Sequence, residues 1–394
     1  MNEQGSEDVE FSFYSPGRIR FGQGARKEIG KLAKVYGGKC LIVRTSLKNN
    51  GREKYFSEIT NSLSENGIEY VIFDQVQPNP TIDIVDKAKK NAIEENVDFV
   101  LAFGGGSSID TAKAVALMVY NKEYTWEFCF NEFSNPFSDN DETIQALPVL
   151  AINTTAGTGS QVTQAAVITN PLKNEKNTLF HSCLFPRLSI IDPELMVTVP
   201  EKITAITGFD ALSHAIESYF NPKASMLSTT LSLQAVTLIV KTLPKVIMDL
   251  ENVELREKIA YADYLAGICL SNAGAEAPHP IGEIINGYYP EIAHGETLAF
   301  VYPSFFKSVS KKIPDKMEVV LQILKEYAPA GEHQAIDEKA FVTMKNFLKA
   351  IDLSVSLTSL AIPEDIVHEM KGKLFFNLPL TDSKGMQEIL INSL

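Results

Sequence analysis

Short apolar runs alternate with longer polar and charged stretches through the first half of the chain. The runs, each rich in β-branched or aromatic side chains, are Lys39–Arg44, Glu69–Phe73, Asp98–Phe103, Pro148–Asn153 and Leu188–Ile191. Charged stretches of helical length separate the first three of them, for example Ile84–Asn96. Apolar strands separated by helices are typical of βαβ units, so the pattern predicts a mostly parallel sheet in an α/β domain. Within it, the polar, turn-rich segment Asn131–Thr143 is expected to form a surface excursion.

The second half of the chain follows a different period. From about Pro200 onward, apolar residues recur with the spacing of a helix face, and strand-like runs are scarce. The periodic segments are Ile206–Ser218, Ser228–Met248, Val253–Ser271, Met317–Tyr327 and Glu338–Ala350. We therefore predict an all-α second domain. The turn signals at Val197–Pro200 mark the change, which divides the chain into residues 1–198 and 199–394.

Composition narrows the class of protein. Of the 394 residues, 45% are hydrophobic and 22% charged, ordinary values for a soluble globular protein. Acidic residues outnumber basic ones by 49 to 36, and a net charge of −13 argues against a nucleic-acid or membrane partner. No apolar run approaches the roughly 20 residues that span a bilayer, and the polar N-terminus is unlike a secretory signal. The four cysteines form no disulfide or metal pattern, so we expect a cytoplasmic protein with reduced thiols.

A glycine-rich turn follows the third predicted strand. Gly104, Gly105, Gly106 and Ser107 lie between that strand and a predicted helix over Ile109–Val119. Glycines let the backbone approach a pyrophosphate closely, and a helix N-terminus offers free N–H groups and a positive dipole end. Asp110 and Lys113 follow in the first turns, where Lys113 would add positive charge. A plain glycine-rich connection is the alternative, but these fixed offsets favour phosphate binding.

A second loop, Asn153–Thr163, also follows a predicted strand and is rich in small hydroxyl residues. Its Thr154, Thr155 and Thr158 suit the phosphate or ribose edge of a cofactor, although by itself the loop could simply be a turn. The sequence Gly22-Gln23-Gly24 resembles the start of a dinucleotide fingerprint but lacks the third glycine, and we give it no cofactor role.

Half of the six histidines gather in a metal-binding pattern in the second domain. Asp210 and His214 are four residues apart on a predicted helix, so both project from one face, and Glu217 could support them from behind. His279 and His294 lie among small and apolar residues rather than on charged faces. One carboxylate with three imidazoles suits a first-row divalent metal such as iron(II) or zinc.

Together these motifs resemble the iron-containing (group III) alcohol dehydrogenase family. The matching segments run in order over nearly the whole chain: Pro78–Thr81, Gly104–Lys113, Thr154–Ser160, Asp192–Leu195, Gly208–His214, Ile292–Gly295 and Asn377–Thr381. The resemblance implies a dehydroquinate-synthase-like fold, in which an α/β nucleotide-binding domain and a helical domain hold a metal in the cleft between them. It also implies a homodimer and reversible oxidation of an alcohol by NAD(P).

The resemblance assigns roles to residues of this chain. The metal ligands are expected to be Asp210, His214, His279 and His294. The cofactor is expected to contact Arg44, Ser46, Asn79, Gly104, Gly105, Gly106, Ser107, Asp110, Thr154, Thr155, Thr158 and Lys176, the last of them at the nicotinamide ribose. Iron(II) is the expected metal, with zinc as the alternative.

Two departures from the family pattern matter. Many members carry a second histidine four residues after the third ligand, where it assists proton transfer, and here that position is Glu283. If His279 were instead that second histidine, the ligand position would fall near Ala275 or Glu276; we favour His279 as the ligand because this alignment needs a smaller insertion. The unusual loop Asn286–Ile292 argues against a pocket for simple short alcohols.

The cofactor preference depends on the segment after the first strand of the fold. An acidic residue there would bind the ribose 2′-hydroxyl of NAD and repel a 2′-phosphate. This chain has Arg44-Thr45-Ser46 and no acid, so NADP is favoured over NAD.

The predicted function is hydride transfer between the nicotinamide and an alcohol, aldehyde or ketone at the metal, with the proton leaving through water, ribose hydroxyls or Glu283. Polyol-type, sugar-acid-type and dehydroquinate-synthase-like enzymes share the two-domain plan and remain alternatives, which basic residues lining the cleft would favour. Maleylacetate-reductase-like enzymes work without a metal, and a non-enzymatic cofactor sensor is a further class.

Overall fold

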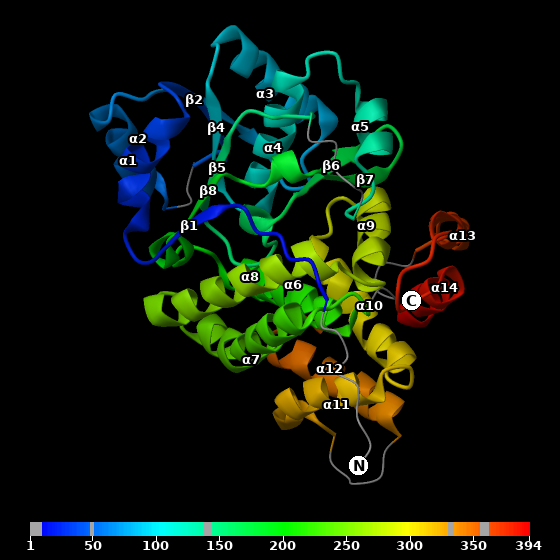
Figure 1. The fold of residues 1–394 in the computed structure, drawn as a ribbon. Helices are drawn as coiled ribbons and strands as arrows, with labels where there is room; N and C mark the ends of the chain where they lie inside the picture. The colour runs from blue at the N-terminus through cyan, green and yellow to red at the C-terminus, as the bar shows by residue number, and fades with distance from the viewer. Residues whose placement is uncertain (1–9, 48–50, 138–142, 330–334, 355–361) are drawn as a thin grey trace, which may run out of the picture.

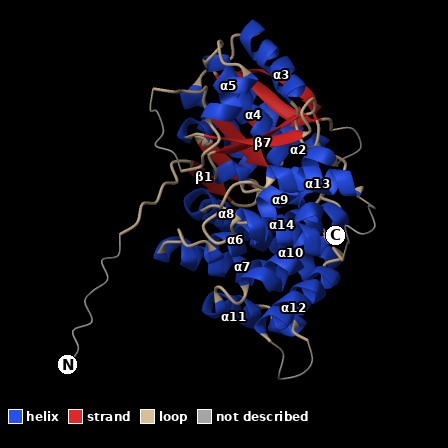
Figure 2. Cartoon of the chain, turned by 90° about the vertical axis from the view of Figure 1, so that its right-hand side faces the viewer, coloured by secondary structure: helices blue, strands red, loops and turns tan. Residues whose placement is uncertain are grey.

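Strands gather in one half of the molecule, and the other half consists of helices. This is a computed structural model, which describes residues 10–47, 51–137, 143–329, 335–354 and 362–394. Figure 1 shows the sheet and its covering helices in the N-terminal, blue-to-green part of the chain, above helices of the C-terminal part. The view turned by 90° in Figure 2 separates the two parts in the same way.

All strands of the main sheet are parallel. Their order is β1 (Arg18–Phe21), β8 (Leu188–Ile191), β5 (Val149–Asn153), β4 (Phe99–Gly104), β2 (Lys39–Thr45) and β3 (Glu69–Val76). The inner strands β4 and β5 are buried throughout, which is why they appear in the sequence as unbroken apolar runs. The predicted parallel α/β sheet is confirmed.

Alternate side chains of each strand enter the cores on opposite faces of the sheet. Leu41 and Val100 pack in the core with α3 (Ile82–Glu94) and α4 (Gly106–Tyr120), whereas Cys40 and Leu101 pack in the core with α1 (Ile29–Ala33) and α2 (Glu53–Glu65). The sheet is thus covered on both faces, and its carboxyl-terminal edge stays available for a site.

An antiparallel hairpin, β6 (Ala165–Asn170) and β7 (Glu175–Phe180), follows the main βα units and was not predicted. Its second strand reads EKNTLF, too polar to be recognised as a strand from its pattern. Helix α5 (Trp126–Glu132) packs against β7, and β6 packs against α4. The hairpin therefore carries polar side chains from the sheet half toward the helical half.

The second half of the chain forms the helical bundle that was predicted. Its helices are α6 (Glu201–Phe220), α7 (Met226–Met248), α8 (Val253–Ala273), α9 (Pro278–Tyr288), α10 (His294–Val309), α11 (Pro314–Ile323), α12 (Ile336–Ala350), α13 (Glu364–Lys373) and α14 (Ser383–Ser393). Short 3₁₀ segments are η1 (Ala25–Glu28), η2 (Lys34–Tyr36), η3 (Ser160–Val162), η4 (Ser182–Leu184), η5 (Pro193–Met196) and η6 (Lys325–Tyr327). One core runs through the helical half and contains residues of every helix from α6 to α14.

Among the described residues, helix α7 alone is long and apolar enough to cross a membrane by length and composition. It packs between α6 and α8, with Val236, Ile239 and Leu243 buried in the helical core. The core helix of a helical domain has the same length and composition, so the absence of a membrane segment stays a prediction.

Candidate metal and cofactor site

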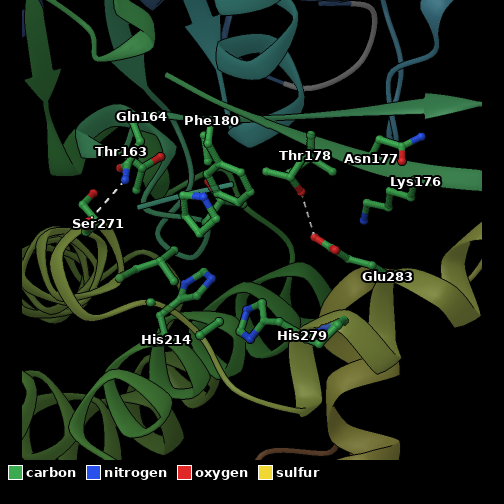
Figure 3. Close-up of a pocket in the computed structure, with 18 of the residues that line it drawn as sticks. Thr163, Gln164, Lys176, Asn177, Thr178, Phe180, His214, Ser271, His279 and Glu283 are labelled. Atoms are coloured by element: carbon green, nitrogen blue, oxygen red, sulfur yellow. Dashed lines mark hydrogen bonds between the residues drawn. The ribbon is translucent and has the colours of Figure 1, made fainter. Parts of the chain in front are cut away.

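A cleft of about 720 Å³ opens between the sheet half and the helical half. The sheet half contributes the N-terminus of α4, the loop before η3 and the β6–β7 hairpin, and the helical half contributes α6, α8, α9 and the start of α10. In the close-up of Figure 3, His214 and His279 lie on the helical side, and Lys176, Asn177 and Thr178 lie opposite them on β7.

The four predicted metal ligands meet in this cleft. Asp210 and His214 lie one turn apart on α6, and each of His214 and His279 places its Nε2 atom 3.7 Å from Oδ1 of Asp210. Asp210, His279 and His294 offer ligand atoms that all lie within 4.8 Å of one another. Helices α6, α9 and α10 thus bring together four side chains from a segment of 85 residues, and the Asp210 carboxylate lies close to the imidazoles.

Each histidine of the cluster has a hydrogen-bond acceptor next to its Nδ1 atom. Nδ1 of His214 lies 3.2 Å from the carbonyl oxygen of Gly157, and Nδ1 of His279 lies 2.9 Å from both carboxylate oxygens of Glu217. Nδ1 of His294 lies 3.2 Å from Oδ1 of Asn286. If each Nδ1 donates a hydrogen to its acceptor, all three Nε2 atoms remain as ligands, which is the arrangement typical of metal-binding histidines.

Unpartnered atoms show that the cluster fits a cation. Asp210 and His279 are 4% and 8% exposed, and within the described part of the chain neither Oδ1 of Asp210 nor Nε2 of His279 has a hydrogen-bond partner. Buried polar atoms are normally paired. A divalent metal bound between them would satisfy both atoms, and one carboxylate with three imidazoles is a suitable ligand set.

The charges of the cluster follow from its burial. Burial lowers the pKa of His214 to about 4 and lowers that of His294 well below its usual value, so both are neutral and able to bind a metal. Burial alone would raise the pKa of Asp210, but the neighbouring imidazoles outweigh it and lower the pKa to about 2. Burial opposes protonation of His279, but Glu217 and Asp210 on either side outweigh it and raise its pKa to about 10. The site therefore favours a positive charge between Asp210 and His279.

Glu276, the alternative third ligand, is turned away from the cleft. Its carboxylate accepts a hydrogen bond from the backbone N–H of Leu380, and its own N–H donates to Glu217. Ala275 does line the cleft but has no ligand atom. This placement favours His279 over both.

Glu283 lies one turn after His279 on α9 and faces Thr178 and Lys176 of β7 across the cleft. Oγ1 of Thr178 donates to Glu283 over 3.1 Å, a contact drawn as a dashed line in Figure 3, and Nζ of Lys176 donates to Asn286 over 3.2 Å. Burial raises the pKa of Glu283, against the opposing effect of Lys176, and burial lowers the pKa of Lys176. The two shifts bring the pKa of the carboxyl and that of the amine closer together, which eases proton transfer at this side of the cleft.

The glycine-rich turn and the threonine loop pack face to face. A side chain at Gly105 would come within 2.5 Å of Thr155, and one at Gly106 within 2.6 Å of Thr158. Of the predicted phosphate contacts, Gly106, Ser107, Asp110 and Thr158 line the cleft, as do Asn79 and Lys176. Gly104, Gly105, Thr154 and Thr155 do not line it. They support this edge of the cleft from behind.

Lys113 does not supply charge to the glycine turn, contrary to the prediction. It is fully buried, and its Nζ donates to Oγ of Ser160 and to the carbonyls of Thr163 and Ala165. Burial lowers its pKa to about 8, against the effect of Asp110. Through these hydrogen bonds it fixes the segment after the threonine loop onto α4, and Oγ of Ser160 in turn donates to the carboxylate of Asp110.

Arg44 and Ser46 lie at the carboxyl end of β2, outside the residues that line the cleft. The guanidinium of Arg44 lies over the ring of Phe56 at 4.6 Å and 3.6 Å from the carboxylate of Asp74. Arg44 is therefore engaged within the protein.

The apolar wall of the cleft could not be recognised from the sequence. It combines Phe130 and Phe137 near α5, Phe180 of β7, Leu270 of α8, and Phe376 and Leu378 before α14. Ser134–Phe137, predicted as part of a surface excursion, contributes to this wall. Its members come from five separate segments, and no local pattern distinguishes them from core residues.

Comparisons with known proteins agree with this architecture. The family described as "Iron-containing alcohol dehydrogenase" matches residues 16–193, and "Fe-containing alcohol dehydrogenase family, C-terminal" matches residues 204–375. The chain is 31% identical to an NAD-dependent methanol dehydrogenase of Bacillus methanolicus over 92% of this chain and 93% of that protein. It is 34% identical to a long-chain primary alcohol dehydrogenase of Thermoanaerobacter ethanolicus over 78% and 76% of the two chains. The crystal structure of a 1,3-propanediol oxidoreductase superposes with a TM-score of 0.87 at 27% identity, covering 98% of this chain and 100% of that one.

Proposed function

The chain belongs to the iron-containing alcohol dehydrogenase family and is a metal-dependent, NAD(P)-linked alcohol dehydrogenase, and we propose that its reaction takes place at the Asp210 cluster of the cleft. The observation that carries this proposal is the pair of buried, unpartnered atoms, Oδ1 of Asp210 and Nε2 of His279, facing each other at 3.7 Å. In the forward direction the enzyme oxidises an alcohol, and in reverse it reduces an aldehyde or ketone.

We assign the metal to Asp210, His214, His279 and His294, with iron(II) as the metal and zinc as the alternative. A divalent cation bound there would lower the pKa of the substrate hydroxyl and stabilise negative charge on its oxygen. The protein's own contribution is to present three imidazoles through Nε2, each fixed by its Nδ1 acceptor. His214 and His294 are already neutral, and the proton that His279 holds in the metal-free protein would leave when the metal binds.

We assign proton transfer to Glu283. Its carboxyl lies in the cleft, burial raises its pKa and so makes it a better proton acceptor than an exposed carboxylate, and Thr178 orients it through Oε1. Lys176 lies on the same side and would contact the ribose of the nicotinamide nucleotide. The proposed ligands come from α6, α9 and α10, Glu283 follows His279 on α9, and Lys176 faces them from β7.

We propose NAD as the cofactor, and the predicted preference for NADP is not supported. A relative similar over nearly the whole chain is named as NAD-dependent. Arg44, the residue expected to meet a 2′-phosphate, packs on Phe56 and beside Asp74. The pyrophosphate would lie at the N-terminus of α4 beside Gly106 and Ser107, where N–H groups of the first helical turn face the cleft.

We propose that the substrate is a primary alcohol with an apolar chain of several carbons. The wall of Phe130, Phe137, Phe180, Leu270 and Phe376 gives such a chain a surface on which it can leave water. The basic residues that line the cleft among the described ones are Lys176 and Lys223. That is little positive charge for the phosphorylated or multiply charged substrates of the dehydroquinate-synthase-like alternatives.

Further proposals rest on the sequence and the family resemblance. We propose that the division into residues 1–198 and 199–394 describes two domains and that the enzyme is a homodimer. We also propose a cytoplasmic enzyme without nucleic-acid or membrane partners, in keeping with the net charge of −13.

The test is metal-dependent turnover on a series of alcohols. Protein stripped with a chelator is reloaded with iron(II), zinc, manganese or magnesium, and NADH formation is followed with primary alcohols of increasing chain length. We expect turnover only after reloading, kcat/KM that rises with chain length, and loss of turnover in Asp210→Ala and His279→Ala. His368→Ala, an exposed histidine on α13, is the matched control and should keep full activity. Turnover by the stripped protein, or an Asp210→Ala variant as active as wild type, would overturn the proposal.

A further inference from the structure

A buried carboxylate of the helical half holds the cofactor loop of the sheet half. Asp263 of α8 is completely buried, and its Oδ1 accepts hydrogen bonds from the backbone N–H groups of Gly157 and Gly159 over 2.8 and 3.1 Å. Its Oδ2 accepts from the side-chain amide of Gln161 over 2.8 Å. Two backbone amides of the Thr154–Ser160 loop are therefore bonded to Asp263 rather than free to bind an anion in the cleft.

The residue Gly157 is held at both of its backbone polar groups. Its N–H donates to Asp263, and its carbonyl oxygen lies 3.2 Å from Nδ1 of the metal ligand His214. The next residue, Thr158, lines the cofactor side of the cleft. One residue, with its two flanking peptide groups, therefore connects the loop that would contact the nucleotide to the imidazole that would contact the metal.

Close packing leaves this loop little room to move. A side chain at Gly157 would meet Thr207 of α6 at 2.6 Å, and one at Gly159, which has φ +62°, would meet the backbone of Gly267 at 2.6 Å. Gly267 lies one turn after Asp263 on α8, so the same helix fixes the loop by hydrogen bonds at one turn and by backbone contact at the next. Interiors packed this tightly transmit displacements instead of absorbing them.

The hydrogen bonds account for a carboxylate at this position. Oδ1 accepts from the loop amides and Oδ2 accepts from Gln161, so both carboxylate oxygens are used. Among the described residues, no lysine or arginine forms an ion pair with Asp263. Asparagine would keep one acceptor for Gly157 and Gly159, and Gln161, whose Oε1 has no partner among the described residues, could rotate its amide to meet the new N–H₂ group. Alanine would leave two buried N–H groups unpaired.

We propose that Asp263 is a positioning residue that couples the nucleotide and metal sites through Gly157. Binding of the nucleotide at the loop fixes Gly157 and thereby His214, and binding of the metal at His214 fixes Gly157 and thereby the loop. Each ligand then strengthens the binding of the other by the same factor. The inference rests on the proposed function because it takes NAD and a divalent metal as the ligands of the cleft.

The experiment measures that factor. Dissociation constants of NAD are determined by titration for metal-stripped protein with and without saturating Zn²⁺, and those of Zn²⁺ are determined with and without NAD. We expect wild type to show a coupling factor of about 5-fold or more. Asp263→Ala should lower it to about 1 and weaken Zn²⁺ binding roughly tenfold. Asp263→Asn should keep the factor within about twofold of wild type, since the acceptor for Gly157 remains.

Arg256→Met is the matched control. Arg256 is also a buried charged side chain of α8, but it donates to Thr204 and to the carbonyls of Val199 and Leu250, away from the cleft. The control should lose thermal stability and keep the coupling factor. A wild-type coupling factor of 1, a normal factor in Asp263→Ala, or equal loss in Arg256→Met would each overturn the inference. If Asp263→Ala does not fold, Asp263→Ser takes its place. Wild type that binds neither NAD nor Zn²⁺ would instead refute the proposed function.

Discussion

Glu217 offers a sharp test of how the metal ligands are held. It is completely buried, and both carboxylate oxygens lie 2.9 Å from Nδ1 of His279. Glu217→Gln keeps the shape and an acceptor for the N–H of Glu276 but removes the negative charge. A charge-assisted hydrogen bond is worth about 1.5 to 3 kcal/mol and a neutral one roughly half of that, so the substitution should cost about 1 to 1.5 kcal/mol.

This loss appears as weaker metal binding. Since 1.4 kcal/mol corresponds to tenfold, we expect the metal dissociation constant to rise roughly 5- to 12-fold. Glu217 also stabilises the proton that the metal must displace from His279, so its loss makes that displacement easier. A divalent ion carries twice the charge of a proton and gains more from Glu217, so Glu217→Gln should still weaken metal binding. Above the pKa of His279, about 10, the proton no longer competes and the full difference should be seen.

The assay is competition with a chelator of known affinity, followed by absorbance, with circular dichroism to verify folding. Glu276→Gln is the control. Glu276 is an equally buried glutamate whose backbone N–H donates to Glu217, but its side chain accepts from Leu380 and bonds to no histidine. A Glu217→Gln variant that folds and binds Zn²⁺ as tightly as wild type would refute this account of the ligand geometry.

Three further predictions concern the proton path, the cofactor and the response to pH. Glu283→Gln should lower kcat about 10²- to 10³-fold with little change in the dissociation constant of NAD, and a loss below threefold in steady-state assays would contradict its role. Wild type should have a higher kcat/KM with NAD than with NADP, and Arg44→Ala should keep the kcat/KM for NAD within about threefold of wild type. A larger loss of kcat/KM with NAD would show that Arg44 contacts this cofactor. Burial raises the pKa of Glu276 from 4.5 to about 8, so the folded form retains a proton that the unfolded chain releases, and stability falls as the pH rises from about 4.5 to 8. In wild type the free energy of unfolding, measured by urea denaturation, should therefore be lower at pH 8 than at pH 5, and Glu276→Gln should reduce this difference by roughly 2 to 4 kcal/mol. An unchanged difference would contradict the raised pKa of Glu276.

Much of the fold could be predicted because apolar patterning is a local signal. The run Leu188–Ile191 coincides with β8, and Val253–Ser271 lies within α8. Strand β7 was missed, since EKNTLF is partly exposed and polar and owes its conformation to pairing with β6. Helices α9 and α10 were missed because the glycine- and proline-rich segment that contains their histidines has no regular apolar face.

The metal cluster could be predicted as a set of residues but not as a geometry. Asp210 and His214 share a helix face, His279 and His294 are marked by their small and apolar sequence surroundings, and the resemblance to the family assigns all four as ligands. What holds them could not be predicted, because the acceptors behind the imidazoles lie on other segments. Gly157, for example, lies in a loop of the sheet half, and its link to His214 depends on how the two halves pack.

Charged residues were the least predictable. Lys113 was expected to face a phosphate, but it turns toward the carbonyls of Thr163 and Ala165, which a sequence pattern cannot reveal. Asp263 gave no motif at all, and its importance appears only when its four donors are seen together. A buried charge is defined by its tertiary partners, so composition and spacing contain little information about it.

The central claim is that one divalent metal, held by Asp210 and the three histidines, makes the cleft an alcohol dehydrogenase site. The most direct test is an anaerobic titration of stripped wild type and His279→Ala with iron(II), in which bound metal and NAD-linked oxidation of a primary alcohol are measured on the same samples. The account predicts that turnover in wild type rises in proportion to bound iron and saturates at one ion per chain, while His279→Ala binds weakly and stays inactive. Turnover that does not follow bound metal, or a His279→Ala variant that binds and oxidises as wild type does, would contradict it.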